Sequence, residues 1–284
     1  MRRTRLHKQL LILALFAAVL ATYAARQNAH SVAAQTQSRI LKQPSDQPLA
    51  SQPIPRTWTR PDASKIPAGP SGESILLGMR IFTETPKYAS AYVGDQLSCS
   101  NCHLQGGTMS YAIALVGVPS WFPMFSERAK RNISLEERIQ ECVTRSENGT
   151  PLPHGGPEMA ALISYFEWLS KQASYGASVP ARGLAALPSL EGNPVRGATI
   201  YKEQCSTCHG DDGVGVPRIL PALWGPDAYN DGAGMNQVKK MAAFVMRNMP
   251  QNNPGTLTPQ QAYDVSAYVA SKPHSAYNPA YDIY

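Results

Sequence analysis

The stretches CSNCH (residues 99–103) and CSTCH (residues 205–209) are two copies of one pattern, Cys-x-x-Cys-His, and they decide the fold class. Two thiols at this spacing can form thioethers to the vinyl groups of one haem, and the adjacent histidine can bind the iron, so the pattern is typical of c-type haem attachment. The alternatives are a disulfide, a pair of zinc ligands and chance. A zinc ribbon does not need a histidine directly after the second cysteine.

Two copies in one chain, together with the export signal described below, favour haem over those alternatives. We therefore predict two covalently bound haem c groups. The predicted attachment and iron-binding residues are Cys99, Cys102 and His103 for the first haem and Cys205, Cys208 and His209 for the second.

The second half of the chain is similar to a small single-haem cytochrome c throughout. Gly197 and Tyr201 precede Cys205 at four-residue spacing, as expected of a helix that leads into the motif. The segment PALWG (residues 221–225) resembles the family segment whose proline carbonyl holds the ring of the proximal histidine. Such a partner sets the tautomer and basicity of the histidine. A closing helix is predicted after Thr258, the expected N-cap.

The first half repeats this plan loosely. A helix predicted over residues 73–85 precedes its haem motif, and another, over 158–172, follows it. The pattern predicts an all-α fold of two tandem cytochrome c-like domains, each with one haem c. The predicted boundaries are 1–34 for a signal peptide, 35–70 for a flexible linker, 71–176 for the first domain with the catalytic haem, 177–193 for a linker, and 194–284 for the second domain with the electron-transfer haem.

The N-terminus carries the features of an export signal. Arg2, Arg3, Arg5 and Lys8 precede an apolar run of 16 residues, and small residues follow. This layout predicts a secretory signal and a periplasmic protein. An uncleaved membrane anchor is the alternative, although a spanning helix needs about 17–25 apolar residues. Without residues 1–34 the chain has 21 basic and 20 acidic residues, so nothing indicates nucleic-acid binding.

Each haem iron has a sixth position, and its occupant largely determines function. In the second domain Met249 precedes Pro250, which favours an extended loop that can present the sulfur. The other candidates are Met235, Met241 and Met246. Met241 and Met246 lie in a helical pattern, where core packing is expected. His/Met ligation raises the reduction potential and suits electron transfer. We therefore predict Met249 as the ligand of the second iron.

The fifth cysteine, Cys142, is the candidate in the first domain. It follows His103 by 39 residues, and Met249 follows His209 by 40. Competing sixth ligands are Met124 and His154, and a free cysteine can also be a small buried core residue.

The helix around Cys142 adds a chemical argument. Ser134 and Glu137 form a predicted capping box. Arg138, Cys142, Arg145 and Ser146 follow helical spacing, which predicts a shared face. Guanidinium groups favour a thiolate and can bind a small oxyanion. The alternative is that both arginines are solvated or paired with the glutamates of the same helix.

The chain after the linker resembles the thiosulfate dehydrogenase family, the tetrathionate-forming dihaem cytochromes c. The match lies in YVGDQLSCSNCHLQGG (92–107), FPMFSER (122–128), ERIQECVTRSENGTPLP (137–153) and NMP (248–250). The resemblance implies that Cys142 is the distal ligand of the first haem and the residue on which thiosulfate reacts. It also implies that Arg128, Arg138 and Ser146 line the substrate pocket. Some members have lysine at position 248; with asparagine there, we expect plain His209/Met249 ligation.

The implied reaction joins two thiosulfates to tetrathionate and releases two electrons to an external acceptor such as a small cytochrome c. Arginines would offset the repulsion between the dianions, and a cysteine sulfur can carry one of them as a covalent adduct. Thiolate ligation should stabilise ferric iron, so we expect Cys142 to leave the iron or be capped by substrate before electrons move. The alternatives are tetrathionate reduction at the same site, a non-catalytic dihaem electron carrier, or another sulfur-oxidation cytochrome with a cysteine-ligated haem.

Overall fold

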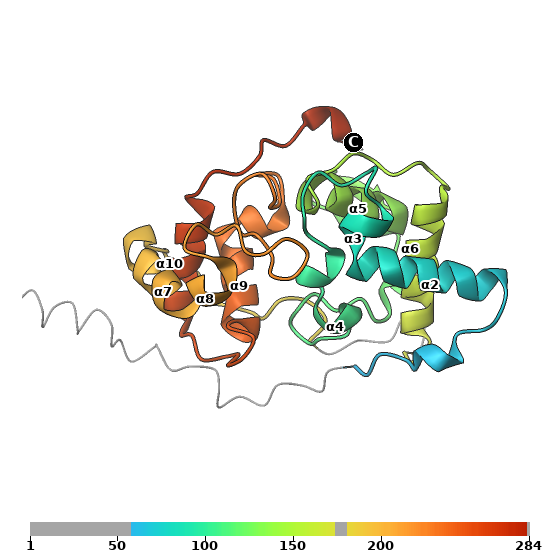
Figure 1. The fold of residues 1–284 in the computed structure, drawn as a ribbon, viewed down its shortest axis with the longest axis horizontal. Helices are drawn as coiled ribbons and strands as arrows, with labels where there is room; N and C mark the ends of the chain where they lie inside the picture. Colours follow the sequence, from blue (N-terminus) through green and yellow to red (C-terminus); the bar gives the residue numbers. More distant parts are fainter. Residues whose placement is uncertain (1–57, 174–180, 283–284) are drawn as a thin grey trace, which may run out of the picture. The chain divides into compact units, whose positions relative to one another are not determined.

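Two crossing helices hold together the first half of the chain in the computed structural model, which describes residues 58–173 and 181–282. They are α2 (Pro70–Thr83) and α6 (Pro157–Ser170), and Figure 1 shows them packed against each other. Gly78 makes this close approach possible, because a Cβ there would overlap the carbonyl oxygen of Ala161. The predicted helices over 73–85 and 158–172 are thus present, with α2 beginning three residues earlier.

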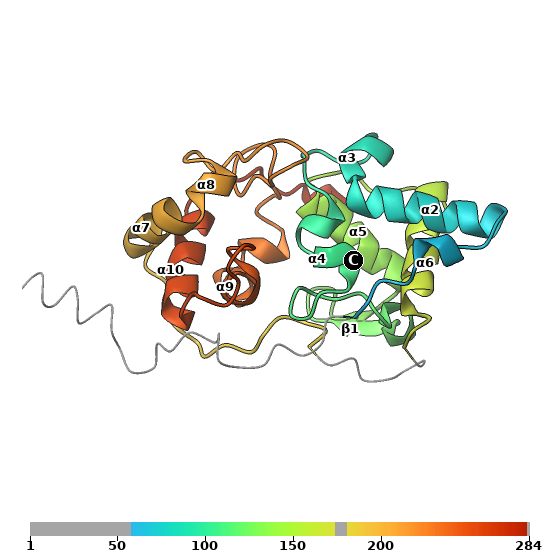
Figure 2. The same cartoon turned by 60° about the horizontal axis from the view of Figure 1, so that its bottom comes forward.

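The second half is built in the same way. Helix α7 (Pro194–Gln204) packs on α10 (Pro259–Ala270), which also contacts α9 (Val238–Asn248), and the three lie together in Figure 2. Gly197 repeats the role of the glycine in α2, since a Cβ there would overlap the carbonyl oxygen of Asp264. The capping box predicted at Thr258 is present, with Gln261 as its partner. The second half therefore repeats the helix packing of the first half.

Short elements connect these helices, and several of them contain predicted site residues. In chain order they are η2 (Ala63–Lys65), α3 (Thr85–Tyr88), η3 (Cys99–Asn101), α4 (Leu104–Gly107), η4 (Val118–Trp121), α5 (Leu135–Glu141), η5 (Cys142–Ser146), α8 (Ser206–His209), η6 (Gly234–Asn236) and η7 (Pro279–Tyr281).

The fold is mostly helical, as the all-α prediction expects, with one short exception. Strands β1 (Met124–Ser126) and β2 (Arg131–Ile133) form an antiparallel hairpin, with Met124 opposite Ile133 and Ser126 opposite Arg131. Its four-residue turn includes Lys130 with φ 54°. A two-stranded ribbon of this length has little periodicity, and its stability comes from packing on the helices. The hairpin matters because Arg128 lies in its turn.

Hydrogen bonds and apolar contacts join the two halves, which belong to one unit over Pro48–Tyr284. Asn230 Nδ2 donates to the Thr144 carbonyl at 2.8 Å, and Asn248 Nδ2 donates to the Tyr111 carbonyl at 3.1 Å. Leu104, from the first half, packs in one cluster with Phe244 of α9 and with Met249, which follows α9.

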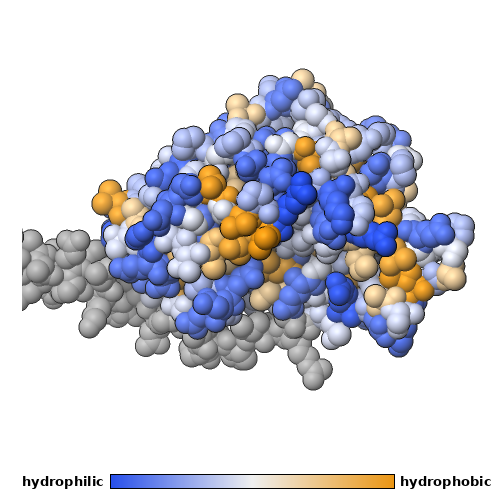
Figure 3. Space-filling model, viewed as in Figure 1, coloured by the Kyte–Doolittle hydropathy of each residue, from blue (hydrophilic) through white to orange (hydrophobic). Residues whose placement is uncertain are grey.

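The surface shown in Figure 3 is largely polar, with apolar residues in small separate groups. The most exposed large apolar side chains include Val195, Ile219 and Phe125. No helix in the described part of the chain has the length and apolar character that a bilayer span needs. The predicted signal peptide, most of the 35–70 linker and the start of the 177–193 linker lie outside the described residues.

Candidate haem-binding and substrate site

The first haem motif holds its histidine in a fixed orientation. His103 Nδ1 lies 2.7 Å from the carbonyl oxygen of Ile113, and the His103 amide donates to the Cys99 carbonyl at 3.0 Å. Burial lowers the pKa of His103, and the Ile113 carbonyl opposes this effect. A neutral ring whose Nδ1–H donates to a carbonyl leaves Nε2 as the nitrogen that can bind a metal.

The second motif has the same arrangement. His209 Nδ1 lies 2.9 Å from the carbonyl oxygen of Pro221, which confirms the contact expected from the PALWG segment. The His209 amide donates to the Cys205 carbonyl at 3.0 Å. Burial lowers the pKa of His209 and the Pro221 carbonyl partly offsets it, so this ring too is neutral and oriented.

The four paired cysteines fit a haem better than the alternatives. All five cysteines of the chain are free thiols, so no disulfide uses them. Within residues 58–173 and 181–282, the structure shows no group of three or more His, Cys, Asp or Glu side chains that could hold a metal ion. Burial, and more weakly the Glu147 and Asp95 carboxylates, raise the pKa of Cys102 to about 12, which favours an uncharged sulfur such as that of a thioether. The residues present therefore fit one haem c at each motif.

Cys142 lies where an α-helix changes into a π-helical turn. The capping box of Ser134 and Glu137 starts α5 as predicted, and η5 begins at Cys142. Widened turns of this kind occur often at functional sites. Asn230 binds the turn from the second half, through its amide to the Arg145 carbonyl at 3.1 Å and its side chain to the Thr144 carbonyl.

The guanidinium groups favour a thiolate at Cys142, as expected, but burial outweighs them. Burial raises the pKa of the half-buried Cys142 thiol to about 11. The Arg138 guanidinium, and more weakly Arg128, lower that pKa, whereas Glu141 and Glu147 raise it. Desolvation of the charged form outweighs two partly exposed guanidiniums. A metal ion that a thiol coordinates favours its thiolate form, so a metal at Cys142 would offset the effect of burial.

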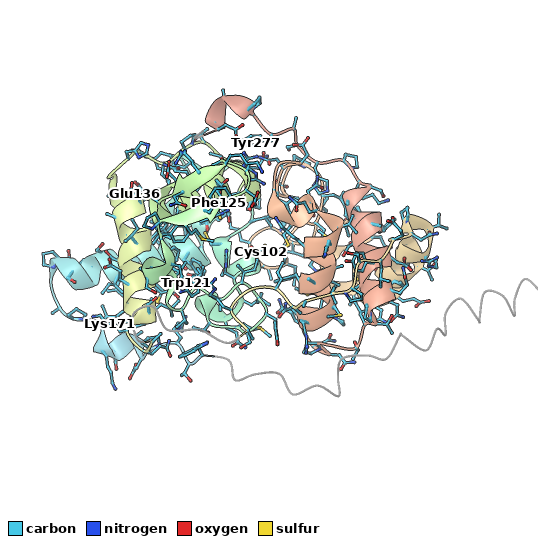
Figure 4. All side chains as sticks on the ribbon, turned by 180° about the vertical axis from the view of Figure 1, so that it is seen from behind. Cys102, Trp121, Phe125, Glu136, Lys171 and Tyr277 are labelled. Carbon is cyan, nitrogen blue, oxygen red and sulfur yellow. The ribbon has the colours of Figure 1, made fainter. Side chains whose placement is uncertain are left out.

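The shared face predicted for the cysteine helix holds only in part. Arg138 and Cys142 are neighbours, but the Arg145 side chain, 8% exposed, pairs with Asp282 and stacks on the Tyr277 ring at 3.8 Å. Tyr277 is labelled in Figure 4. A π-helical turn holds more residues than an α-helical turn, so the side chains after Cys142 point in other directions than they would in an α-helix. A shared face predicted at 3.6 residues per turn therefore does not hold after Cys142. Ser146, at the end of the turn, is half buried.

Arg128 and Arg138 converge on one buried carboxylate. Glu141, 4% exposed, forms an ion pair with Arg138 Nη1 at 2.6 Å and accepts a hydrogen bond from Arg128 Nη1 at 3.4 Å. Arg128 Nη2 also donates to the Gly232 carbonyl in the second half at 3.3 Å. Both guanidiniums keep about a third of their side-chain surface exposed, 33% and 39%, so each can still reach an anion.

The candidate sixth ligands differ in location: some lie in loops or at the surface, and others are buried in the core. Met249 follows α9 in extended conformation, φ −123° and ψ 150°, as predicted. Met241 and Met246 are buried in core clusters, also as predicted. The competitor His154 has a 79% exposed side chain near Glu136, and Met124 lies in β1.

Asn248, beside Met249, is held firmly. It is fully buried, and its side-chain amide donates to Tyr111 and Phe244 carbonyls at 3.1 and 2.9 Å. This geometry agrees with an asparagine that anchors the loop rather than binding iron.

Sequence reasoning missed three contributors to these sites. The Ile113 carbonyl has no side-chain signal, although its position after the first motif parallels that of Pro221 after the second. Glu141 was considered only as a competitor for the arginines. Asp282 lies 137 residues from Arg145, and no pattern in the chain links the two.

Comparisons with known proteins agree with this arrangement. Residues 86–174 match the family "SoxA/TsdA, cytochrome c domain", and residues 192–269 match "Cytochrome C oxidase, cbb3-type, subunit III". The chain is 37% identical to thiosulfate dehydrogenase of Stutzerimonas stutzeri, over 74% of this chain and 71% of that protein. It is 37% identical to thiosulfate dehydrogenase of Allochromatium vinosum, over 79% and 87%.

A solved structure is also similar, that of thiosulfate dehydrogenase (TsdBA) from Marichromatium purpuratum in its "as isolated" form. The TM-score is 0.72 at 35% sequence identity, over 78% of this chain. The chain spans about half of that solved chain, 51%.

Proposed function

The chain belongs to the thiosulfate dehydrogenase family of cytochrome c oxidoreductases, and on this premise we propose that it oxidises two thiosulfates to tetrathionate in the periplasm. The observation that carries the proposal is the convergence of Arg128 and Arg138 on Glu141 beside Cys142. A soft sulfur nucleophile next to paired guanidiniums suits a small anion with a soft sulfur end and an oxyanion end.

Two haem c groups would be held by the residues of the two motifs. Cys99 and Cys102 would attach the first, with His103 as proximal ligand and Cys142 as distal ligand. Cys205 and Cys208 would attach the second, with His209 and Met249 on the iron. When bound, the haems supply acceptors for two electrons, taken one at a time.

The arginines have two tasks in this scheme. Their exposed N–H groups bind the sulfonate oxygens of thiosulfate, and their charge reduces the repulsion between two dianions. Glu141 holds both guanidiniums in place, so little side-chain entropy is lost when the anion binds. Ser146, half buried at the end of η5, adds a hydroxyl near the same turn.

Cys142 would act as the covalent carrier. A bond forms between its sulfur, as thiolate, and the outer sulfur of the first thiosulfate, and two electrons leave. A second thiosulfate then attacks that outer sulfur, so the bond to Cys142 breaks, tetrathionate leaves and the thiolate returns. One difficult coupling is thereby divided into two easier displacements.

The second half would pass electrons onward to an external acceptor such as a small cytochrome c. Cys208 is exposed, and the following loop carries the exposed apolar side chains of Val214, Val216 and Ile219. Apolar residues around an accessible haem edge suit a short-lived contact with another redox protein.

The test is thiosulfate-dependent reduction of an added cytochrome c by purified holoprotein, with tetrathionate measured as product. Cys142→Ser should lose turnover while retaining both haems, because a hydroxyl stays protonated at neutral pH. Cys142→Met keeps a sulfur that can bind iron but cannot form the adduct, and it should be inactive as well. A fully active Cys142→Ser protein would instead favour a plain electron carrier.

A further inference from the structure

Lys240 lies in the first turn of α9, near enough to Arg128 in the hairpin turn and to Arg138 and Glu141 in α5 for their charges to act on it. The loop before it reaches the same place, since the Gly232 carbonyl accepts from Arg128 at 3.3 Å. A Cβ on Gly234 would lie 3.9 Å from Lys240 Cδ, so the lysine stem folds back over η6. Lys240 therefore borders the region where Arg128 and Arg138 meet.

The electrostatics agree with this placement. Burial lowers the pKa of Lys240, and the Arg128 and Arg138 guanidiniums lower it further, whereas Glu141 raises it. These are the groups that also act on Cys142. Lys240, Arg128, Arg138 and Glu141 thus form one cluster of charges, and its two arginines and its carboxylate act on the thiol.

The charge of that cluster indicates what it binds. Arg128 and Arg138 share Glu141, so without Lys240 their net charge is +1. Thiosulfate is a dianion, and the reaction brings a second one to the same place. With Lys240 the net charge of these four side chains is +2, and it stays positive when Cys142 is a thiolate. Like charges held together without an anion repel each other, so the arrangement is favourable only when an anion is present.

Lys240 also differs from the lysine beside it. Within the described part of the chain its ammonium has no ion pair or hydrogen bond. Lys239 Nζ instead lies 3.4 Å from Ser189 Oγ, in contact with the 181–193 segment. Consecutive residues of a helix point about 100° apart, so only one of the two lysines faces the cluster.

We propose that Lys240 is the third cation of the thiosulfate site, contributed by the second half, so that the anion binds where the two halves meet. The inference rests on the proposed function, because it names a further substrate-binding residue of the same site. In this scheme the second half does more than pass electrons to the acceptor, because it also contributes a substrate-binding residue.

The experiment compares Lys240→Gln with Lys240→Arg and with the matched control Lys239→Gln. Losing one charge that faces a dianion should raise the KM for thiosulfate about 10-fold at low salt. The difference should shrink as salt screens the charges. Lys240→Arg should restore the KM, and Lys239→Gln should behave as wild type. Unchanged haem spectra show that the variants fold.

A binding measurement separates this inference from the proposed reaction. Calorimetric titration of thiosulfate into Cys142→Ser protein, with and without Lys240→Gln, reports affinity where no turnover is expected. About 10-fold weaker binding in the double variant supports the third cation, even if wild-type protein fails to make tetrathionate. Equal affinities, together with a KM for Lys240→Gln equal to that of Lys239→Gln, would overturn the inference while leaving thiosulfate oxidation intact.

Discussion

Replacing Asp282 by asparagine should loosen the π turn that carries Cys142. Asp282 Oδ1 accepts from Arg145 Nη2 in the turn and from the Tyr277 hydroxyl at 2.9 Å. The Tyr277 ring lies under the same guanidinium. Asparagine can still accept a hydrogen bond, but it leaves a buried guanidinium without its counter-charge.

The magnitude follows from the burial of the two partners. Breaking a fully buried ion pair costs about 3–5 kcal/mol, whereas an exposed pair contributes about 0–1 kcal/mol. The Arg145 side chain is 8% exposed and that of Asp282 is 38% exposed, so the pair lies between these limits. We expect Asp282→Asn to lower the free energy of unfolding by about 2 kcal/mol. The urea midpoint should fall by about 1 M.

The assay is urea unfolding of the holoprotein together with low-temperature EPR of the first haem. A looser turn should give Cys142 more than one position, and the EPR signal should broaden or split. Asp231→Asn is the matched control, because Asp231 Oδ1 accepts only from the Tyr277 amide at 2.8 Å, and asparagine keeps that bond. If Asp282→Asn matches this control in both measurements, the clamp on the turn does not exist.

Mass spectrometry of the mature protein should show two covalent haem additions, because both motifs hold an oriented histidine beside free thiols; a mass with one haem would exclude the dihaem arrangement. Met249→Ala should remove the His/Met spectral signature of the second haem and lower its potential without altering the first haem, whereas Met246→Ala should only reduce stability. The opposite outcome in optical and redox titrations would move the ligand into α9. Gly197→Ala should destabilise the holoprotein by about 2 kcal/mol in urea unfolding, since its Cβ would overlap the α10 backbone. Gly183→Ala, where a Cβ meets nothing within 4 Å, should be near neutral, and equal effects of the two substitutions would contradict the packing argument.

Features with a local cause could be predicted from the sequence. The haem motifs, the cap at Thr258 and the extended conformation of Met249 depend on residues within a few positions of one another. The contact between His209 and the Pro221 carbonyl was expected because the PALWG segment resembles a known one. In each case the residues that determine the geometry are neighbours in the chain.

Features that depend on distant packing were missed or wrong. The β1–β2 hairpin has no strong strand pattern and depends on packing against the helices. The π turn at Cys142 is supported by Asn230 from the other half, so the α-helical spacing that grouped Arg145 with Cys142 could not hold. The arginines lower the pKa of the Cys142 thiol as expected, but burial, which no pattern in the chain reports, outweighs them.

The haem motifs and the proposed anion site also differ in the sequence separation of the residues that form them. This separation affects the order in which the sites assemble. The bonds that orient the two histidines close loops of 10 and 12 residues. The bonds that bring the halves together at the anion site join residues 86 and 104 positions apart. Short loops close faster and at lower entropic cost than long ones. A folding chain should thus be able to hold its haems before it can recognise thiosulfate. In rising urea we expect thiosulfate binding to disappear at a lower concentration than the spectral signature of histidine ligation, and simultaneous loss would show that the two capacities arise together.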